Sequence, residues 1–249
     1  EMINRDFVLI PLFELTNYNF NIPKYGKLIR YIWVFMSKKY KFIVVEGPIG
    51  VGKTTLARKL ANNLNSKIML EKFQDNPFLE KFYKDIDKYA LSTQLHFLLQ
   101  RSSDLMKLST DDMSIANNNY VSDYFINKDK LFAKTILSKD EYELYMKIFN
   151  ALKINLPTPD LIIYLQASPN ILLERIESRG NNFEKNITKS YLQKITEAYT
   201  QYFYSYKESP LLIINTSSVD INKSHDYMML LDEINKDIKG KNYFNPSAV

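Results

Sequence analysis

The stretch that decides the fold reads Gly47-Pro48-Ile49-Gly50-Val51-Gly52-Lys53-Thr54-Thr55. It matches the phosphate-binding loop pattern G-x-x-x-x-G-K-[ST], with the lysine and the first threonine at the diagnostic positions. A short β-branched run at residues 41–45 precedes the loop, and residues 56–60 after it have helical spacing. This order of strand, loop and helix predicts an α/β protein that binds a nucleoside triphosphate.

The residue types of the loop suit this chemistry. The glycines let successive backbone N–H groups converge on an anion, because no Cβ blocks the conformations that this requires. The helix beginning near Lys53 points its positive dipole end at the phosphates, and the Lys53 ammonium reaches their oxygens. Thr54 offers a hydroxyl ligand to Mg²⁺. We therefore expect residues 47–55 to line the nucleotide site.

Further short apolar runs alternate with helix-length segments. They lie at residues 68–70, 120–122, 161–165 and 211–214, in addition to the run at 42–45. Together these runs predict a five-stranded parallel sheet flanked by helices. Because the phosphate loop follows the first strand, functional side chains are expected at the carboxyl ends of the other strands as well.

Composition limits the other possibilities. With 249 residues and 45% hydrophobic content, the chain can form one α/β domain with additional segments. The net charge of +5 comes from scattered lysines without a basic block, so no nucleic-acid partner is expected. Cysteine is absent from the sequence, and the apolar run at residues 28–36 is too short to span a bilayer. These features predict a cytoplasmic protein without a membrane partner.

Two segments that follow predicted strands carry family motifs. Residues 71–78 read EKFQDNPF, and residues 123–133 read DYFINKDKLFA. Here the chain resembles the deoxyribonucleoside kinases, most closely the bacterial deoxyadenosine and deoxyguanosine kinases, over residues 38–220. The likeness includes residues 172–180 and the helix at 191–206. It implies a P-loop kinase fold with a helical lid, ATP and Mg²⁺ as cofactors, a deoxyribonucleoside substrate in nucleotide salvage, and a homodimer.

The resemblance also implies catalytic roles. Glu71 matches the general base beside the 5′-hydroxyl of the nucleoside, and Asp123 matches the acidic residue that helps to hold Mg²⁺. Arg175 and Arg179 match lid arginines, whose guanidinium groups bind two phosphate oxygens at once. Lys53 completes the expected catalytic set. The alternatives are an exposed glutamate that begins a helix and a pair of arginines on a helix surface.

Two positions depart from the family pattern. Tyr124 stands where most members have arginine, so that cation near the reacting oxygens is missing from its usual position. Either another cation substitutes for it, or this subgroup handles the charge differently. Asn181 stands where the lid often carries a further arginine.

Polar residues are placed by the resemblance in a nucleoside pocket. Gln94, Arg101 and Asp129 match the set that recognises the base, and Asp129 can accept from an exocyclic amine if Arg101 keeps it ionised. Thymine lacks that amine, so discrimination against thymidine is expected, with a preference for purines taken from the bacterial branch. The remaining expected contacts are Tyr83 and Glu184 at the sugar 3′-hydroxyl, and Phe73 and Phe97 as apolar walls.

Residues 1–36 do not fit the kinase pattern. Residues 5–15 resemble the carboxyl-terminal stretch of hydroxymethyldihydropterin pyrophosphokinase, R-x-F-V-L-x-P-L-x-E, in which the matching Arg5 contacts ATP and the matching Phe7 contacts the pterin. The predicted organisation is an N-terminal extension at 1–36 and a kinase domain at 37–249. The alternative function is the C-terminal part of a bifunctional folate-pathway fusion, and a simpler interpretation is an apolar segment packed on the kinase.

A nucleotide-dependent regulatory switch would share the phosphate loop. Such a GTPase would also carry the guanine-reading motif N-K-x-D, whereas residues 127–130 read NKDK, with the aspartate one place early. The switch is therefore the less favoured class.

Overall fold

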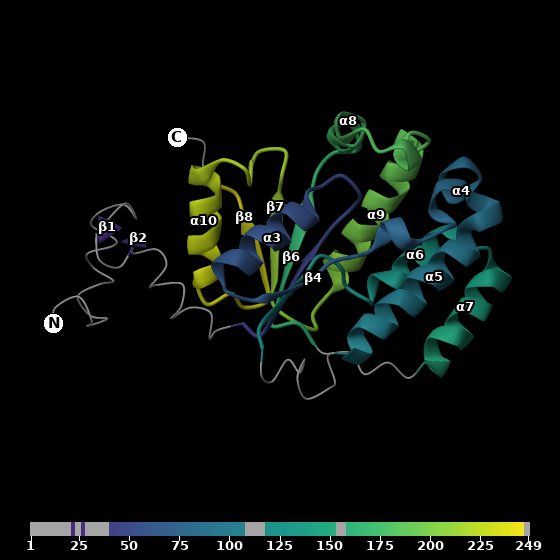
Figure 1. The fold of residues 1–249 in the computed structure, drawn as a ribbon, viewed down its shortest axis with the longest axis horizontal. Coiled ribbons are helices and arrows are strands. Elements are labelled where there is room, and N and C mark those ends of the chain that lie inside the picture. Colours follow the sequence, from purple (N-terminus) through teal and green to yellow (C-terminus); the bar gives the residue numbers. More distant parts are fainter. Residues whose placement is uncertain (1–20, 23–25, 28–39, 108–117, 153–157, 247–249) are drawn as a thin grey trace.

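The strand that leads into the phosphate loop lies inside a six-stranded sheet in which all neighbouring strands run parallel (Figure 1). In order across the sheet, the strands are β4 (Lys67–Met69), β5 (Tyr120–Ser122), β3 (Phe42–Glu46), β6 (Leu161–Gln166), β7 (Leu211–Asn215) and β8 (Lys241–Phe244). From β3 the chain winds first to the β4–β5 side and then crosses to the β6–β8 side. The phosphate loop thus lies where the winding changes direction, the usual ligand position in such sheets.

The structure is a computed structural model that describes residues 21–22, 26–27, 40–107, 118–152 and 158–246. Most of the predicted N-terminal extension, including Arg5 and Phe7, lies outside the described residues, as does the apolar run at 28–36. Two short strands of the extension, β1 (Asn21–Ile22) and β2 (Gly26–Lys27), pair in antiparallel orientation. The proposed boundary near residue 36 therefore stays a prediction.

The five predicted strands are all present, and the sheet contains one more. The central strands are apolar throughout because helices cover both faces of a parallel sheet, and every residue of β3 is buried. The missed strand, β8, lies at the edge of the sheet beside β7, and only Phe244 of its four residues is buried. Its sequence, Lys-Asn-Tyr-Phe, contains no apolar run, so the pattern that identified the other strands did not apply to it.

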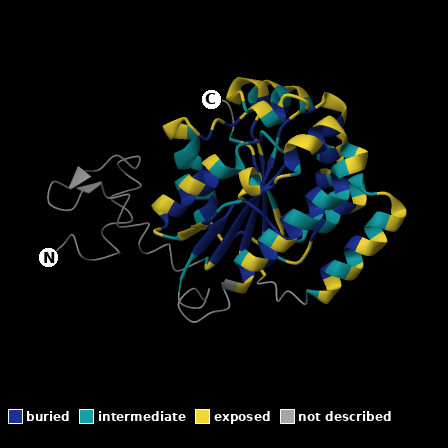
Figure 2. Cartoon of the chain, turned by 45° about the vertical axis from the view of Figure 1, so that its right-hand side comes forward, coloured by how far each residue is buried: buried dark blue, intermediate teal, exposed yellow. Residues whose placement is uncertain are grey.

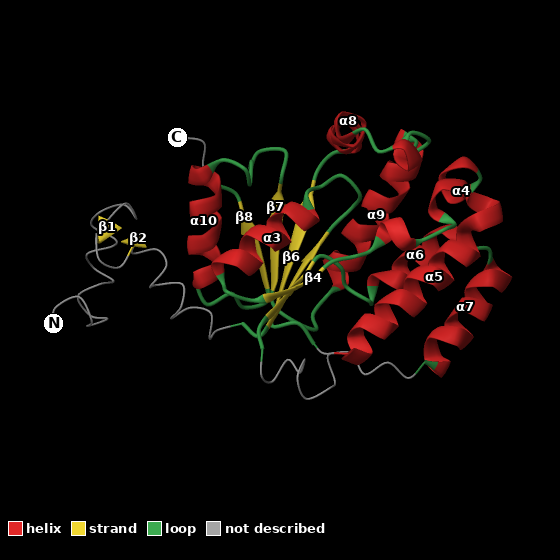
Figure 3. Ribbon diagram, in the orientation of Figure 1, coloured by secondary structure: helices red, strands yellow, loops and turns green. Residues whose placement is uncertain are grey.

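Helices enclose the sheet, with their exposed faces turned outward (Figure 2). In the view of Figure 3, α10 lies to one side of the strands, whereas α4 to α7 and α9 lie to the other. The helices that follow the loop and the strands are α3 (Lys53–Asn63), α4 (Leu79–Lys84), α5 (Ile86–Lys107), α6 (Lys128–Ile136), α7 (Lys139–Ala151), α8 (Pro169–Arg179), α9 (Lys189–Ser205) and α10 (Ser224–Asn235). Two short 3₁₀ helices, η2 (Phe73–Asp75) and η3 (Asn182–Glu184), lie between them. Among the described helices, none combines the length and apolarity needed to cross a bilayer.

An aromatic stack fixes α9 against the centre of the sheet. The ring of Tyr164 on β6 lies 4.4 Å from the ring of Phe203 and 6.0 Å from that of Tyr199, both on α9. All three side chains are buried, and stacked rings at these distances add to the stabilisation that burial supplies. Packing therefore sets the position of Tyr199, whose hydroxyl reaches the end of β3.

Substitution of alanine for Gly50 should destabilise the protein more than the same substitution at Gly180. Both glycines have left-handed backbones, with φ of 82° and 70°, which costs a residue with a Cβ about 1–2 kcal/mol. A Cβ at Gly50 would also lie 2.9 Å from the Leu172 carbonyl oxygen, whereas a Cβ at Gly180 would meet nothing within 4 Å. We expect urea unfolding to show an additional loss of about 1–3 kcal/mol for Gly50→Ala. Equal losses for the two variants would contradict this packing.

Candidate active site

A cavity opens at the carboxyl ends of β3, β4 and β5, beside the phosphate loop. Most of the predicted site residues line it: Gly47, Ile49, Gly50, Lys53, Thr54, Glu71, Phe73, Tyr83, Gln94, Phe97, Arg101, Asp123, Arg179 and Glu184. They come from the loop, the segments after β4 and β5, helices α4, α5 and α8, and η3. The fold therefore brings together segments that are up to 137 residues apart in the sequence, from Gly47 to Glu184.

The phosphate loop is shaped around the Lys53 ammonium. Lys53 Nζ donates to the carbonyl oxygens of Gly47, at 2.7 Å, and Pro48, at 3.1 Å. Burial and the neighbouring Lys128 lower the pKa of Lys53 to about 8, while nearby carboxylates oppose the shift. The ammonium therefore keeps its charge at neutral pH, as a ligand for phosphate oxygens requires.

The two predicted Mg²⁺ ligands lie in direct contact. Thr54 Oγ1 donates to Asp123 Oδ2 at 2.5 Å, and the backbone N–H of Glu71 donates to Asp123 Oδ1 at 2.7 Å. Burial raises the pKa of Asp123, although these two hydrogen bonds lower it in part. The described residues contain no group of three or more His, Cys, Asp or Glu side chains that could hold a metal. A hydroxyl and a carboxylate fit Mg²⁺, which commonly takes its remaining oxygen ligands from water and substrate phosphates.

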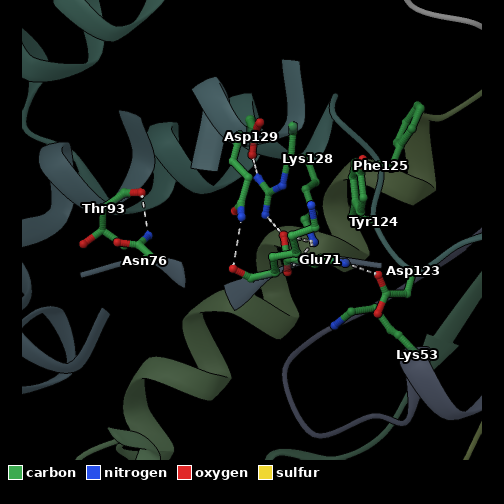
Figure 4. A network of polar contacts seen from close by, with 12 residues as sticks. Lys53, Glu71, Asn76, Thr93, Asp123, Tyr124, Phe125, Lys128 and Asp129 are labelled. Carbon is green, nitrogen blue, oxygen red and sulfur yellow. Dashed lines mark hydrogen bonds and ion pairs between the residues drawn. The ribbon is translucent and has the colours of Figure 1, made fainter. Parts of the chain in front are cut away.

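Glu71 lies among positive charges (Figure 4). It forms a close ion pair with Arg101, and its carboxylate lies 3.5 Å from Lys128 Nζ. Burial alone would raise the pKa of Glu71, but the charges of Arg101 and Lys128 outweigh that effect and lower the pKa to about 2. The side chain is 16% exposed, so the alternative of an exposed glutamate is wrong.

Arg101 joins the predicted base to the predicted recognition set. Its guanidinium pairs with Asp129 as well as with Glu71, and it lies 4.8 Å from the centre of the Phe97 ring. Asp129 is fully buried behind Arg101 and is not among the residues that line the cavity. Gln94 does line the cavity, and its side-chain carbonyl oxygen has no hydrogen-bond partner within the described structure.

The two predicted lid arginines occupy different places. Arg179 binds Glu184 with two hydrogen bonds, of 2.6 and 3.1 Å, and Asn181 donates to the same carboxylate at 3.0 Å. Arg175 instead donates to the side chain and the backbone carbonyl of Thr216, at 2.9 and 2.8 Å. Arg175 lies in a second recess, lined also by Gly50, Val51, Gly52, Thr55, residues 216–223 and Asp226. Gly50 lines both spaces, so they meet at the phosphate loop.

Two charged residues beside the site, Glu46 and Lys128, were not predicted. Glu46, the last residue of β3, accepts from the backbone N–H groups of Gly47 and Phe125, at 2.9 and 2.8 Å, and from the Tyr199 hydroxyl at 2.9 Å. Lys128, the first residue of α6, lies 3.6 Å from the same carboxylate and lines the cavity. A charged residue at the end of an otherwise apolar strand was the available signal for Glu46. For Lys128, the signal was its place within the motif at 123–133.

The acid sensitivity of folding should depend on Glu71. Its pKa is about 2 in the folded protein against an ordinary value of 4.5, so the stability that it contributes is complete above pH 4.5 and is lost as the pH falls toward 2. This shift corresponds to a contribution on the order of 3 kcal/mol. We expect urea unfolding across this range to show a smaller loss of stability for Glu71→Gln than for the wild type. The exposed Glu177→Gln variant should follow the wild type, and parallel curves for all three proteins would contradict the pairing.

Comparison with known proteins bears on the identity of this site. The family model for deoxynucleoside kinase matches residues 43–239. The deoxyguanosine kinase of Bacillus subtilis is 41% identical over 158 residues, which cover 64% of this chain and 76% of the relative. The deoxyadenosine/deoxycytidine kinase of the same organism is 31% identical over 205 residues, which cover 79% of this chain and 92% of that relative.

A solved structure shows the same fold. The deoxyadenosine kinase from M. mycoides with bound dCTP superposes with a TM-score of 0.68 at 23% identity, over 78% of this chain and 98% of that chain. At this identity the likeness bears on the fold alone. The predicted kinase resemblance is confirmed by the family match and the relatives. The chain belongs to the deoxynucleoside kinase family and is a phosphotransferase that acts on a deoxynucleoside.

Proposed function

We propose that this enzyme transfers the γ-phosphoryl group of ATP to the 5′-hydroxyl of deoxyadenosine or deoxyguanosine in nucleotide salvage. The observation that carries the proposal is a single cavity that joins the phosphate-loop Lys53 and Thr54 to Glu71 and to the polar residues Gln94 and Arg101. The names of the relatives from Bacillus subtilis include both purine deoxyribonucleosides, which supports the choice of acceptor.

In the proposed reaction, the acceptor 5′-oxygen forms a bond to the γ-phosphorus as the bond to the β-phosphate oxygen breaks. The Glu71 carboxylate is ionised at neutral pH and accepts the hydroxyl proton. Its low pKa makes it a weak base, which is sufficient if the proton leaves late in a loose transition state. Lys53 binds the phosphate oxygens and neutralises their charge. Mg²⁺, when bound by Thr54 and Asp123, would neutralise further charge on the β and γ oxygens.

The choice of base is proposed to depend on Gln94. Its unpaired carbonyl oxygen can accept from the exocyclic amine of adenine, guanine or cytosine, whereas thymine presents a carbonyl oxygen, a second acceptor, in place of that amine. Asp129 is engaged by Arg101 and would act by holding that guanidinium in place. Tyr83 and Glu184 are proposed to contact the sugar, and the aromatic rings of Phe73 and Phe97 to form the walls of the cavity.

The second recess is proposed to take the part of ATP beyond its phosphates. It adjoins the phosphate loop at Gly50, and its lining is mostly polar, with Arg175 held against Thr216. Arg175 would then contact ATP in the second recess, whereas Arg179 lines the cavity that is proposed to hold the nucleoside.

The fusion with a pterin pyrophosphokinase, the cellular location and the absence of further partners are hypotheses from the sequence. The family match begins at residue 43, and the reported relatives carry nucleoside kinase names, so the fusion with a pterin pyrophosphokinase gains no support from them. The cytoplasmic location and the absence of a nucleic-acid or membrane partner remain predictions from sequence.

Phosphate transfer from ATP with Mg²⁺ to four deoxyribonucleosides tests the proposal. We expect turnover of deoxyadenosine and deoxyguanosine, with kcat/KM for thymidine lower by about 10-fold or more, because an unpaired buried acceptor costs about 1–3 kcal/mol. Glu71→Gln should lower kcat by about 10²–10⁴-fold, while the exposed Glu177→Gln variant should match the wild type. Preference for deoxycytidine would overturn the purine assignment. Failure to phosphorylate any nucleoside despite ATP binding would overturn the proposed reaction.

We also propose that the enzyme is a homodimer that pairs through helices α5 and α7. These helices contact each other, and they expose Leu99, Met106 and Leu144, with 52%, 51% and 47% of each residue accessible. Leu99 and Met106 are seven positions apart and therefore share one face of α5. Burial of such a patch against a second copy would remove it from water.

Sedimentation velocity can test this interface. The double variant Leu99→Glu/Leu144→Glu should sediment as a monomer, because two buried carboxylates in an apolar interface cost several kcal/mol. Tyr204→Glu, at an exposed position on α9, should leave the oligomeric state unchanged. A double variant that remains dimeric would place the interface elsewhere, and a monomeric wild type would refute the dimer itself.

A further inference from the structure

Tyr124, which stands in place of the family's arginine, does not point into the active site. Its side chain is buried in the hydrophobic core beside Phe42, Met69 and Leu105, and it is not among the cavity-lining residues. The tyrosine hydroxyl has no hydrogen-bond partner within the described structure. Position 124 therefore supplies neither a charge nor a donor to the reacting groups.

Four cations line the cavity within the described residues: Lys53, Arg101, Lys128 and Arg179. Lys53 belongs to the phosphate loop. Arg101 is held by Glu71 and Asp129 in close ion pairs, and Arg179 is held by Glu184 with two hydrogen bonds. Each of these three already has a defined partner or role.

Lys128 is buried but only loosely bound. Its ammonium lies 3.6 Å from Glu46 and 3.5 Å from Glu71, distances longer than the 2.7–3.2 Å typical of such hydrogen bonds. An ammonium carries three donors, so donor capacity remains for a further acceptor in the cavity. Only 4% of the residue is exposed, and electrostatic interactions are stronger in such a water-poor place.

The position of Lys128 is fixed by its local structure. It is the first residue of α6, and its backbone N–H donates to the Phe125 carbonyl oxygen at 3.0 Å. Figure 4 shows its side chain directed at Glu71, with Asp123 and Lys53 nearby. The ammonium therefore lies beside the carboxylate that would receive the proton of the acceptor hydroxyl.

We propose that Lys128 supplies, from the first turn of α6, the positive charge that position 124 lacks, by donating to an oxygen of the phosphoryl group as it is transferred. This inference rests on the proposed kinase reaction. Lys128 takes part in no proton transfer and no covalent step. It stabilises the negative charge of the transition state. It therefore raises kcat and does not strengthen the binding of the substrates in the ground state.

A purely structural role is the competing explanation, because Lys128 also balances two buried carboxylates. Four variants separate the two roles: Lys128→Met, Lys128→Arg, Glu46→Gln, and the double variant Lys128→Met/Glu46→Gln. Lys134→Met serves as the matched control, since Lys134 is an exposed lysine on the same helix. For each protein, the folded fraction and thermal midpoint are measured first, followed by the Kd for ATP with Mg²⁺ and by kcat and KM with the best acceptor.

We expect Lys128→Met to lower kcat per folded molecule by about 10²–10³-fold, with the Kd for ATP and the KM for the acceptor within about 3-fold of wild type. Lys128→Arg should retain kcat within about 10-fold, because it keeps the charge, and Lys134→Met should behave as wild type. Removal of the Lys128 charge should lower kcat by a similar factor in the Glu46→Gln background.

Two outcomes would overturn the inference while leaving the kinase reaction intact. One is a Lys128→Met enzyme whose kcat per folded molecule equals that of Lys134→Met. The other is a Glu46→Gln background in which Lys128→Met has no effect on kcat, which would assign Lys128 to charge balance alone. If Lys128→Met does not fold, the double variant is compared with Glu46→Gln, and Lys128→Arg is compared with the wild type. A wild type that phosphorylates no deoxyribonucleoside would refute the kinase reaction and this inference together, whereas an active wild type with an equally active Lys128→Met refutes the inference alone.

Discussion

A line of alternating buried charges connects the elements of this active site. It runs from Asp129 through Arg101, Glu71 and Lys128 to Glu46, and so joins α6, α5, the segment after β4 and the end of β3. Removal of one partner from a buried ion pair leaves an uncompensated charge and typically costs about 3–5 kcal/mol. Each element is thus held in place by charges that its neighbours supply, and the position of the candidate base depends on all of them.

The same line of charges extends to the phosphate loop. Glu46 accepts the backbone N–H of Gly47, at the start of the loop, and the hydroxyl of Tyr199, which the aromatic stack on α9 holds in place. Helix packing on one side of the sheet is thereby linked to the conformation of the loop at the carboxyl end of β3. The carboxylate at position 46 contributes to the architecture of the nucleotide site without facing the cavity itself.

The sequence was most informative where a local pattern has a single physical meaning. The glycines and the lysine of the phosphate loop, and the apolar runs of the buried strands, identified the fold and the site. Strand β8 was missed because an edge strand with three residues not fully buried has no apolar pattern. Lys128 and Glu46 were missed because their importance arises from contacts between distant elements. The separation of Arg175 from Arg179 could not be foreseen from their spacing, because four residues on a helix suggest one shared face, whereas here each guanidinium follows its own partner.

Arg101 belongs at once to the residues proposed to select the substrate and to those proposed to perform the reaction, because one guanidinium contacts both Asp129 and Glu71. Such sharing restricts how an enzyme of this kind can evolve. A mutation that retunes recognition through Arg101 or Asp129 would also alter the charge around the base, so a lineage that changes its preferred nucleobase by this route risks its catalytic rate. A position outside the shared pair, such as Gln94 in the cavity wall, offers a route to new preferences that leaves the charges around Glu71 unchanged.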